Sequence, residues 1–287
     1  MKVIATYNIK GGVGKTTAAV NLSYLAAQDG LRTLLWDLDP QAAATYMFRV
    51  RARVKGGGQA LIRGTRGLDQ AIKGTDFDRL DLLPGDFTYR NMDLLLDGAK
   101  HRARRLSRLL SPLAGHYDLV VLDCPPSISL VSENVLHAAG LILVPLIPTT
   151  LSLRTLDQLT DFVASFDGPR PEVLAFFSMV DRRKRLHREI AERLPTQRAD
   201  VAAAAIPALA VIERMAVERA PVPAFAPRSQ AARSYQDLWG EVGKRVLGLV
   251  RPMGPRDQDG RLRTPAPRVQ VVTFRPVASR LTADYGR

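Results

Sequence analysis

The stretch KVIATYNIKGGVGKTTAAV, residues 2 to 20, decides the fold because it joins a short apolar run to a glycine-rich loop and a helical segment. The general phosphate-binding loop reads G-x-x-x-x-G-K-[ST] between a strand and a helix, where backbone N–H groups surround phosphates. The second half of this pattern is present, whereas Ile9 replaces its first glycine, so the loop is a variant. We therefore expect a nucleotide site formed by Gly11, Gly12, Val13, Gly14, Lys15, Thr16 and Thr17.

Within this loop Lys15 can neutralise the β- and γ-phosphates, and the Thr16 hydroxyl can ligate Mg²⁺, which prefers oxygen ligands. Asp37 and Asp39 follow one apolar run and Asp123 ends another, so these three carboxylates are the candidate metal ligands beside Thr16. Strand alternation places Asp37 and Asp39 on the same side. A turn or capping role is commoner for a single aspartate, but the neighbouring loop favours the metal site.

Short apolar runs alternate with segments of helical spacing along the chain, which predicts an α/β fold: a doubly wound, mostly parallel sheet flanked by helices. The expected strands are residues 2–7, 32–37, 79–83, 117–123, 140–147 and 173–180, and clear helical spacing occurs at 16–29, 99–113 and 153–166. Residues 51–67 are rich in glycine and arginine, so we expect a mobile surface loop or an irregular turn there.

The composition indicates a globular chain with a strong positive charge. Of 287 residues 46% are hydrophobic, and 41 Lys and Arg against 28 Asp and Glu give a net charge of +13. This charge favours polyanionic partners such as nucleic acid or anionic lipid, although an arginine-rich proteome explains it equally well. A single cysteine, Cys124, excludes an internal disulfide, and neither a signal peptide nor an 18-residue apolar run occurs, so we expect a cytoplasmic protein.

The chain divides into a domain of residues 1–250 and a C-terminal tail of residues 251–287. The tail contains five prolines, eight arginines and three acidic residues, with little apolar periodicity apart from VQVVTF at 269–274. We interpret it as an extended basic segment that is disordered alone or ordered by a partner, with VQVVTF able to add to a sheet edge.

The sequence resembles the ParA/MinD family of deviant Walker A ATPases, whose loop reads K-G-G-x-G-K-[ST]. The resemblance continues in LWDLDPQ (35–41), similar to the family's D-x-D-P-Q segment, and in YDLVVLDCPPS (117–127), similar to its Walker B region. It covers approximately residues 1–250 and implies ATP and Mg²⁺ as cofactors.

By this resemblance, Lys10 crosses a homodimer interface to the partner's nucleotide, so that hydrolysis depends on dimerisation. Asp39 orients or activates the attacking water, which makes Lys10, Lys15 and Asp39 the expected catalytic residues. Pro148 and Pro207 match places where the family shapes its adenine pocket, although prolines in ordinary turns look the same. The resemblance also implies a partner protein that stimulates hydrolysis.

ParA-type proteins bind DNA without sequence preference, which implies a nucleoid-associated protein and a basic surface that contacts phosphates. Arg183 falls where the family has a DNA-contacting arginine, within the run DRRKRLHRE at 181–189. The family's I-P-R-N-V-R segment reads IPALAV here, and this departure weakens the assignment to chromosome or plasmid partition. The candidate DNA-binding residues are Arg182, Arg183, Lys184, Arg185 and Arg214, with the runs 49–55 and 101–108 as further basic segments.

Two other classes of function are weighed against this one. A MinD-like protein would bind a membrane through an amphipathic helix, and residues 235–250 have suitable spacing, although packing as a closing core helix explains them better. We therefore consider a membrane partner unlikely. A metabolic enzyme on the same scaffold would need an acceptor-substrate motif, and we recognise none in the sequence.

Overall fold

The computed structural model describes residues 1–166 and 169–248 of the chain. Within this part, eight strands form one sheet: β1 (Lys2–Thr6), β2 (Thr33–Asp37), β3 (Lys73–Gly74), β4 (Leu80–Leu83), β5 (Leu119–Asp123), β6 (Leu141–Leu146), β7 (Glu172–Val180) and β8 (Val201–Pro207). The α-helices are α1 (Lys15–Gln28), α2 (Ala43–Met47), α3 (Gly57–Arg63), α4 (Met92–Asp97), α5 (Arg105–Leu110), α6 (Leu130–Ala138), α7 (Thr150–Ala164), α8 (Arg185–Gln197), α9 (Ala210–Glu213), α10 (Met215–Glu218), α11 (Val222–Phe225) and α12 (Gln230–Leu247). Three 3-10 helices join them: η1 (Phe87–Asn91), η2 (Arg102–Arg104) and η3 (Ser111–Leu113).

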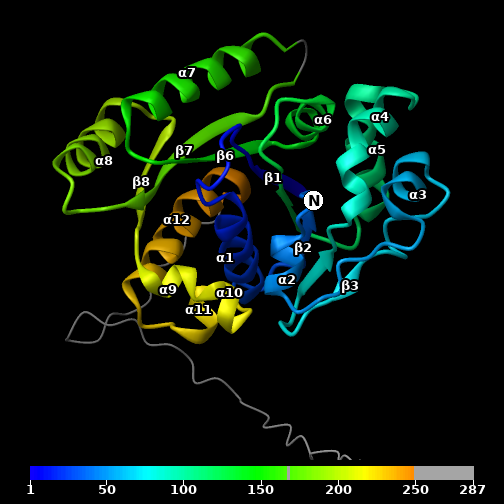
Figure 1. Ribbon diagram of the computed structural model, residues 1–287, viewed down its shortest axis with the longest axis horizontal. Coiled ribbons are helices and arrows are strands. Elements are labelled where there is room, and N and C mark those ends of the chain that lie inside the picture. Colours follow the sequence, from blue (N-terminus) through cyan, green and yellow to red (C-terminus); the bar gives the residue numbers. More distant parts are fainter. Residues whose placement is uncertain (167–168, 249–287) are drawn as a thin grey trace, which may run out of the picture. The chain divides into compact units, whose positions relative to one another are not determined.

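The sheet has the strand order β3-β4-β2-β5-β1-β6-β7-β8, and Figure 1 shows it between helices. All neighbouring strands are parallel except the short β3, which pairs antiparallel with β4. The predicted α/β class with a doubly wound, mostly parallel sheet is therefore confirmed. In register, Asp123 of β5 lies beside Thr6 of β1 and Asp37 of β2, so the ends of three strands bring polar side chains together.

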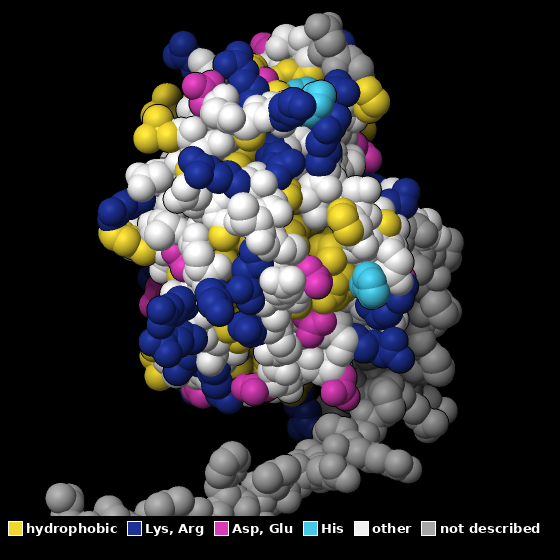
Figure 2. Space-filling model, turned by 90° about the vertical axis from the view of Figure 1, so that its right-hand side faces the viewer, with side chains coloured by type: hydrophobic (Ala, Val, Ile, Leu, Met, Phe, Trp, Pro, Cys, Tyr) yellow, Lys and Arg dark blue, Asp and Glu magenta, His cyan; other side chains and the backbone are white. Residues whose placement is uncertain are grey.

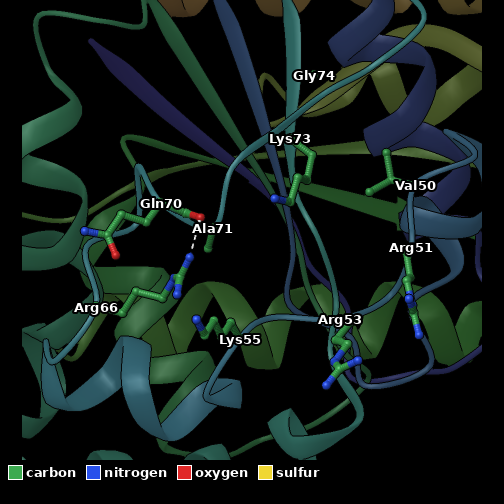
Figure 3. A pocket seen from close by; sticks show the side chains of 9 residues that line it. All are labelled: Val50, Arg51, Arg53, Lys55, Arg66, Gln70, Ala71, Lys73 and Gly74. Carbon is green, nitrogen blue, oxygen red and sulfur yellow. Dashed lines mark hydrogen bonds between the residues drawn. The ribbon is translucent and has the colours of Figure 1, made fainter.

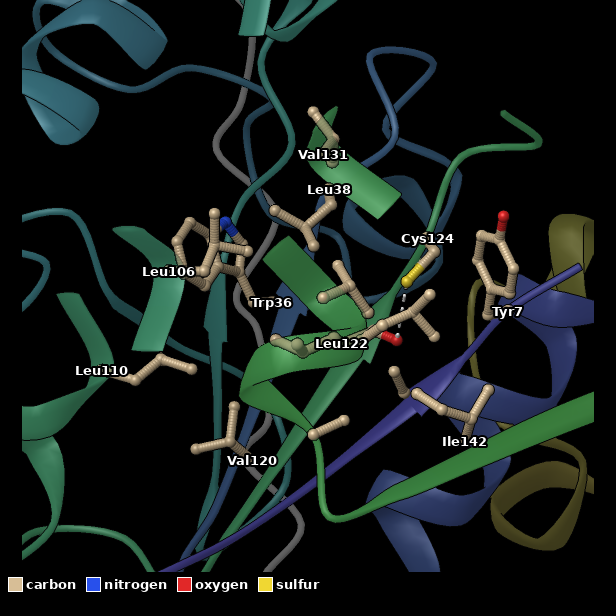
Figure 4. Close-up of a cluster of buried hydrophobic side chains, with 14 of the residues drawn as sticks. Tyr7, Trp36, Leu38, Leu106, Leu110, Val120, Leu122, Cys124, Val131 and Ile142 are labelled. Carbon is tan, nitrogen blue, oxygen red and sulfur yellow. Dashed lines mark hydrogen bonds between the residues drawn. The ribbon is translucent and has the colours of Figure 1, made fainter. Parts of the chain in front are cut away.

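Helices cover both faces of the sheet and bury two separate apolar cores. Along β5, Leu119 and Val121 face the core formed with α1 and α12, whereas Val120 and Leu122 face the core formed with α3 to α7. This alternation explains why the strands are continuous apolar runs, since both faces are covered. Figure 4 shows the second core, where Trp36 of β2 packs near Val120 and Leu122.

Helix α12 packs against the first core as the predicted closing helix. Its residues Tyr235, Leu238, Trp239 and Val242 are each at most 2% exposed. The Trp239 indole donates a hydrogen bond to the Asp29 carboxylate at 2.7 Å. Because the apolar side of α12 is already buried, the packing interpretation is confirmed and the interfacial-helix interpretation of residues 235–250 is not supported. Among the described residues, no helix has the length and apolarity needed to cross a bilayer.

The prediction of a mobile loop or irregular turn at residues 51–67 is wrong in part, because α3 forms within this segment. Gly56 and Gly64 adopt left-handed conformations at the two ends of the helix, with φ of 83° and 72°. Leu61 and Ile62 are fully buried against the second core. The many glycines and arginines of this segment favoured a loop over the short helix α3. The glycines at its two ends begin and end the helix instead of forming a loop.

Two other segments differ from the sequence-based expectation. The continuous helix expected at 99–113 is divided into η2, α5 and η3, and Pro112 lies in the last of these, where it cannot continue an α-helix. Strand β8 was missed because its sequence VAAAAIP is dominated by alanine, which has no preference for strands.

One compact unit spans Met1–Val250. The proposed tail at 251–287, with its predicted edge strand at 269–274, lies outside the described residues.

Candidate nucleotide site

The glycine-rich loop connects the carboxyl end of β1 to the first turn of α1. Gly12 and Gly14 have φ of 70° and 97°, which is the left-handed region that glycine adopts without strain. A Cβ atom on Gly14 would also lie 2.7 Å from the Ser178 hydroxyl of β7. These positions need glycine for the loop to curl tightly, as a phosphate-binding loop requires. Val13 is buried beneath it, so only its backbone can face a ligand.

A hydrogen bond connects the two lysines of the loop. The Lys15 ammonium donates a hydrogen bond to the Lys10 carbonyl at 2.9 Å. The Lys10 N–H donates to Asn8, whose side-chain amide donates in turn to the Pro145 carbonyl of β6. Lys15 is only 6% exposed, and this burial lowers its pKa while the Asp123 and Asp39 carboxylates oppose the shift. A buried cation beside the loop is thus ready to receive an anion.

A cavity of about 380 Å³ opens over the loop. Of the residues predicted from the sequence, it is lined by Gly11, Gly12, Gly14, Lys15, Thr16, Thr17, Asp39 and Pro207. Pro148 is buried and does not line this cavity, so the structure does not support its assignment to the adenine pocket. Pro126, which follows β5 in the segment that resembles the Walker B region, does line it.

Sequence reasoning missed the apolar wall of the cavity. The wall is formed by residues distant in sequence: Met47, Met179, Ile206, Leu209, Ile212 and Tyr235. Met179 has a φ of 55° and is 45% exposed, and it lies near the end of β7, where the register with β8 shifts. An apolar wall opposite a cationic loop suits a ligand with a planar base at one end and phosphates at the other. No sequence signal marked these residues, since each resembles ordinary core.

The Asp123 carboxylate fits a magnesium site. Asp123 is fully buried; its Oδ1 accepts a hydrogen bond from Thr6 at 3.3 Å, while its Oδ2 has no hydrogen-bond partner among the described residues. Burial raises the pKa of Asp123 well above its usual range, the Asp37 charge adds to this, and the Thr16 hydroxyl opposes it. An orphaned buried carboxylate oxygen beside a threonine hydroxyl is an incomplete set of oxygen ligands that a hydrated Mg²⁺ would complete.

Asp37 and Asp39 lie together but differ in their surroundings. The buried Asp37 accepts hydrogen bonds from the backbone and hydroxyl of Thr45 at 2.8 and 2.7 Å, and its other oxygen accepts from the Asp39 N–H. Burial raises the pKa of Asp37 to about 6 against these hydrogen bonds. Asp39 lines the cavity and accepts from the Gln41 N–H. The predicted convergence of both aspartates on one cation is therefore not seen, because Asp37 faces Thr45.

In the described part of the chain, no group of three or more His, Cys, Asp and Glu side chains is placed to hold a metal ion. This arrangement agrees with the few protein ligands that Mg²⁺ takes in nucleotide sites, where waters and phosphates supply the rest.

The candidate DNA-binding residues lie in two groups. Arg182, Arg183 and Lys184 precede α8, whose first residue is Arg185, and Arg214 lies between α9 and α10. Three of the five are ion-paired: Arg183 with Asp181, Arg185 with Glu189 and Arg214 with Glu218. Arg182 and Lys184 form no ion pair with another described residue, so their charges are the most available to phosphates.

Comparisons with known proteins agree with this geometry. A family model described as an AAA domain matches residues 1–172. The chain is 31% identical over 247 residues to the sporulation initiation inhibitor protein Soj of Bacillus subtilis, covering 84% of this chain and 98% of Soj. It is 33% identical over 199 residues to the chromosome partitioning protein ParA of Caulobacter vibrioides, covering 67% and 74% of the two chains.

Among solved structures, the chain is similar to cobyrinic acid a,c-diamide synthase of Mycobacterium smegmatis with a bound ATP analog and magnesium. The TM-score is 0.71 at 25% identity, and the match covers 88% of this chain and 98% of the synthase. The loop, the paired lysines, the strand-end aspartates and these relatives lead to one assignment: the chain belongs to the ParA/MinD family of P-loop ATPases.

Proposed function

We propose that this chain is a ParA-type ATPase that binds ATP with Mg²⁺, forms a sandwich homodimer, and binds DNA without sequence preference. In this proposal, hydrolysis is stimulated by a partner protein, releases the DNA, and thereby partitions or positions a cargo in the cytoplasm along the nucleoid. The observation that carries the proposal is the pair of lysines: Lys15 lies inside the cavity, while Lys10 is absent from the lining of its own cavity although Gly11 beside it contributes.

Within one protomer the loop binds and neutralises the phosphates. The Lys15 ammonium, now hydrogen-bonded to the Lys10 carbonyl, exchanges this neutral acceptor for phosphate oxygens, and its burial strengthens that interaction. Thr16 and Asp123 would hold Mg²⁺, whose charge would stabilise the phosphates during transfer. The N–H groups of the loop and the first turn of α1 add fixed partial positive charge.

Lys10 has its role between protomers. Its backbone is held by hydrogen bonds with Asn8 and Lys15, and it precedes Gly11, which forms the rim of the cavity on this side. A second protomer facing this rim would receive the ammonium near its own γ-phosphate, where negative charge develops during transfer. This explains why the loop needs a second lysine and why turnover would require assembly.

Asp39 is the candidate for positioning the attacking water. It lines the cavity, and its backbone N–H is anchored on the buried Asp37, which is anchored in turn on Thr45 of α2. A carboxylate fixed in this way can accept a proton or a hydrogen bond from water without reorganisation.

The proposed DNA contacts rest on the unpaired charges of Arg182 and Lys184, with Arg183, Arg185 and Arg214 beside them. Phosphate contacts of this kind give sequence-independent, salt-sensitive binding.

The proposal is tested with the full chain by measuring mass in solution, ATP turnover and retention on random-sequence duplex DNA. We expect a monomer without nucleotide, a dimer with Mg²⁺ and ATP, and DNA retention only of the dimer. Lys15→Ala should abolish all three responses, whereas Arg193→Gln, an exposed change on α8, should leave them intact. A chain that turns over ATP as a monomer, or that binds liposomes rather than DNA, would contradict the proposal.

A further inference from the structure

A second cavity lies apart from the nucleotide site, on the segment between α2 and β4. It has a volume of about 540 Å³ and is formed by three stretches of chain, 50–55, 66–71 and 73–74. Its lining is shown in Figure 3: Val50, Arg51, Arg53, Lys55, Arg66, Gln70, Ala71, Lys73 and Gly74. The volume is in the range of cavities that bind small molecules. None of these residues lines the nucleotide cavity.

The lining of this basic cavity carries five cations and no carboxylate. None of the five forms an ion pair with another residue in the described ranges, in contrast to Arg183, Arg185 and Arg214. Figure 2 shows the side of the molecule that carries α3 and α4, where Lys and Arg side chains outnumber Asp and Glu. Arg53 interacts with the Asp86 carboxylate and lowers its pKa. No carboxylate lines the hollow itself, so an anion of several charges would stabilise the five cations around it.

Arg66 has hydrogen-bond donors that no other described residue uses. Its guanidinium donates one hydrogen bond, to the Gln70 carbonyl at 3.0 Å. The Nε atom of Arg66 is buried and has no hydrogen-bond partner among the described residues. Because solvent does not reach Nε, a ligand in the cavity would accept hydrogen bonds from the Nη groups of Arg66 instead. Figure 3 shows this side chain directed toward the cavity that Lys55 and Arg53 also border.

The walls of the basic cavity are held by hydrogen bonds of the fold. The Val54 N–H donates to the buried Asp86 carboxylate at 2.8 Å, which fixes the stretch that carries Arg53 and Lys55. On the opposite wall the Ala71 N–H donates to the Leu68 carbonyl at 2.9 Å, and Lys73 pairs with Leu82 across the β3–β4 ladder. The cations therefore project from fixed backbone, and binding would not require the walls to form first.

We propose that the basic cavity binds a phosphorylated small molecule of nucleotide size with at least three negative charges, at a site separate from the ATP site. A concave cavity whose cations come from three separate stretches of chain favours a compact ligand over a duplex backbone, which extends along a surface. Val50 and Ala71 supply an apolar surface for a non-phosphate part of the ligand. This inference stands on residues outside the proposed ATPase site and does not depend on that function.

The test uses the full chain carrying Lys15→Ala, which removes phosphate binding at the glycine-rich loop, and titrates inorganic tripolyphosphate by calorimetry. We expect one site, weakened at least about tenfold by Arg66→Gln and likewise by the double change Arg53→Gln with Lys73→Gln. The second variant keeps the test valid if Arg66→Gln fails to fold. Arg63→Gln removes a nearby charge outside the lining and should leave the affinity unchanged. ADP and inorganic pyrophosphate carry the same diphosphate, so tighter binding of ADP would identify a nucleotide and equal binding an inorganic polyphosphate; adenosine, which has no phosphate, should not bind.

Three outcomes would overturn the inference. The first is no binding of tripolyphosphate or ADP in the Lys15→Ala background. The second is an equal loss of affinity in Arg63→Gln, which would indicate diffuse charge rather than a site. The third is duplex DNA binding that the cavity variants weaken while tripolyphosphate does not bind, which would make this surface a nucleic-acid contact. In each case the ATPase proposal would remain testable by itself.

Discussion

Replacing Thr45 with valine tests the hydrogen-bond network beneath Asp39. The Thr45 hydroxyl donates to the Asp37 carboxylate at 2.7 Å and accepts from the Gly85 N–H at 2.8 Å, and all three groups are buried. Valine preserves the shape of threonine but removes both hydrogen bonds. The backbone N–H of residue 45 still donates to Asp37, so the carboxylate would lose one partner and not all of them.

The magnitude follows from these contacts. A hydrogen bond to a charged group contributes about 1.5–3 kcal/mol, and an unsatisfied buried N–H costs about 1–3 kcal/mol. Thr45→Val should therefore lower the free energy of unfolding by about 2.5–6 kcal/mol. Thr45→Ser keeps the hydroxyl and loses only a methyl group, which should cost about 1 kcal/mol. The difference in unfolding free energy between Thr45→Val and Thr45→Ser therefore measures the contribution of the Thr45 hydroxyl.

The measurement is urea unfolding followed by circular dichroism, together with ATP turnover of the folded variants. Turnover should also fall in Thr45→Val, because the Asp39 N–H is anchored on Asp37. If Thr45→Val were as stable as Thr45→Ser, the network would not be the support of Asp39 that we infer.

Three further predictions concern the site and its surroundings. Asp39→Ala should retain ATP, remain a dimer by light scattering and turn over at least about 100-fold more slowly; normal turnover would remove Asp39 from its role. Arg182→Glu with Lys184→Glu should weaken DNA retention without affecting dimerisation. The slope of log affinity against log salt concentration should become less steep, by the amount that about two lost phosphate contacts per protomer account for. Unchanged retention would place the DNA surface elsewhere. Burial raises the pKa of Asp86, but hydrogen bonds from Thr88 and Val54 outweigh burial and lower the pKa below 3.8. The ionised carboxylate therefore stabilises the fold above that pH, and this contribution is lost as the pH falls. Asp86→Asn should therefore lower the free energy of unfolding by about 1–2 kcal/mol at neutral pH. Below about pH 4 the difference in unfolding free energy between the variant and the natural protein should become smaller. If urea unfolding gave the same difference at every pH, this prediction would be refuted.

Much of the fold was predictable because its signals are local. The glycine-rich loop, the apolar strands and the strand-end aspartates each follow from neighbouring residues, and the parallel register then brings Asp37 and Asp123 side by side. The errors have local causes too. Glycines at the ends of α3 imitate a loop, and the alanines of β8 carry no strand preference.

The candidate site was predictable only on its phosphate side. Motifs mark residues that contact phosphates and metal, since few side chains perform those roles. The apolar wall, including Met179 and Tyr235, is assembled from distant segments by tertiary packing, and nothing distinguishes its residues from core in the sequence. The same holds for Arg66, whose unsatisfied Nε appears only when the chain is folded.

The most direct test of the trans role of Lys10 is complementation between two inactive variants. Lys10→Ala and Asp39→Ala should both bind ATP and dimerise, and neither should turn over ATP efficiently by itself. In a mixed dimer, the Asp39→Ala protomer supplies an intact Lys10 to the ATP held by the Lys10→Ala protomer, whose own Asp39 is intact. Mixing equal amounts should therefore restore about a quarter of the natural turnover, since about half of the dimers are mixed and each has one complete site of two. Turnover no higher than that of the separate variants would contradict the account.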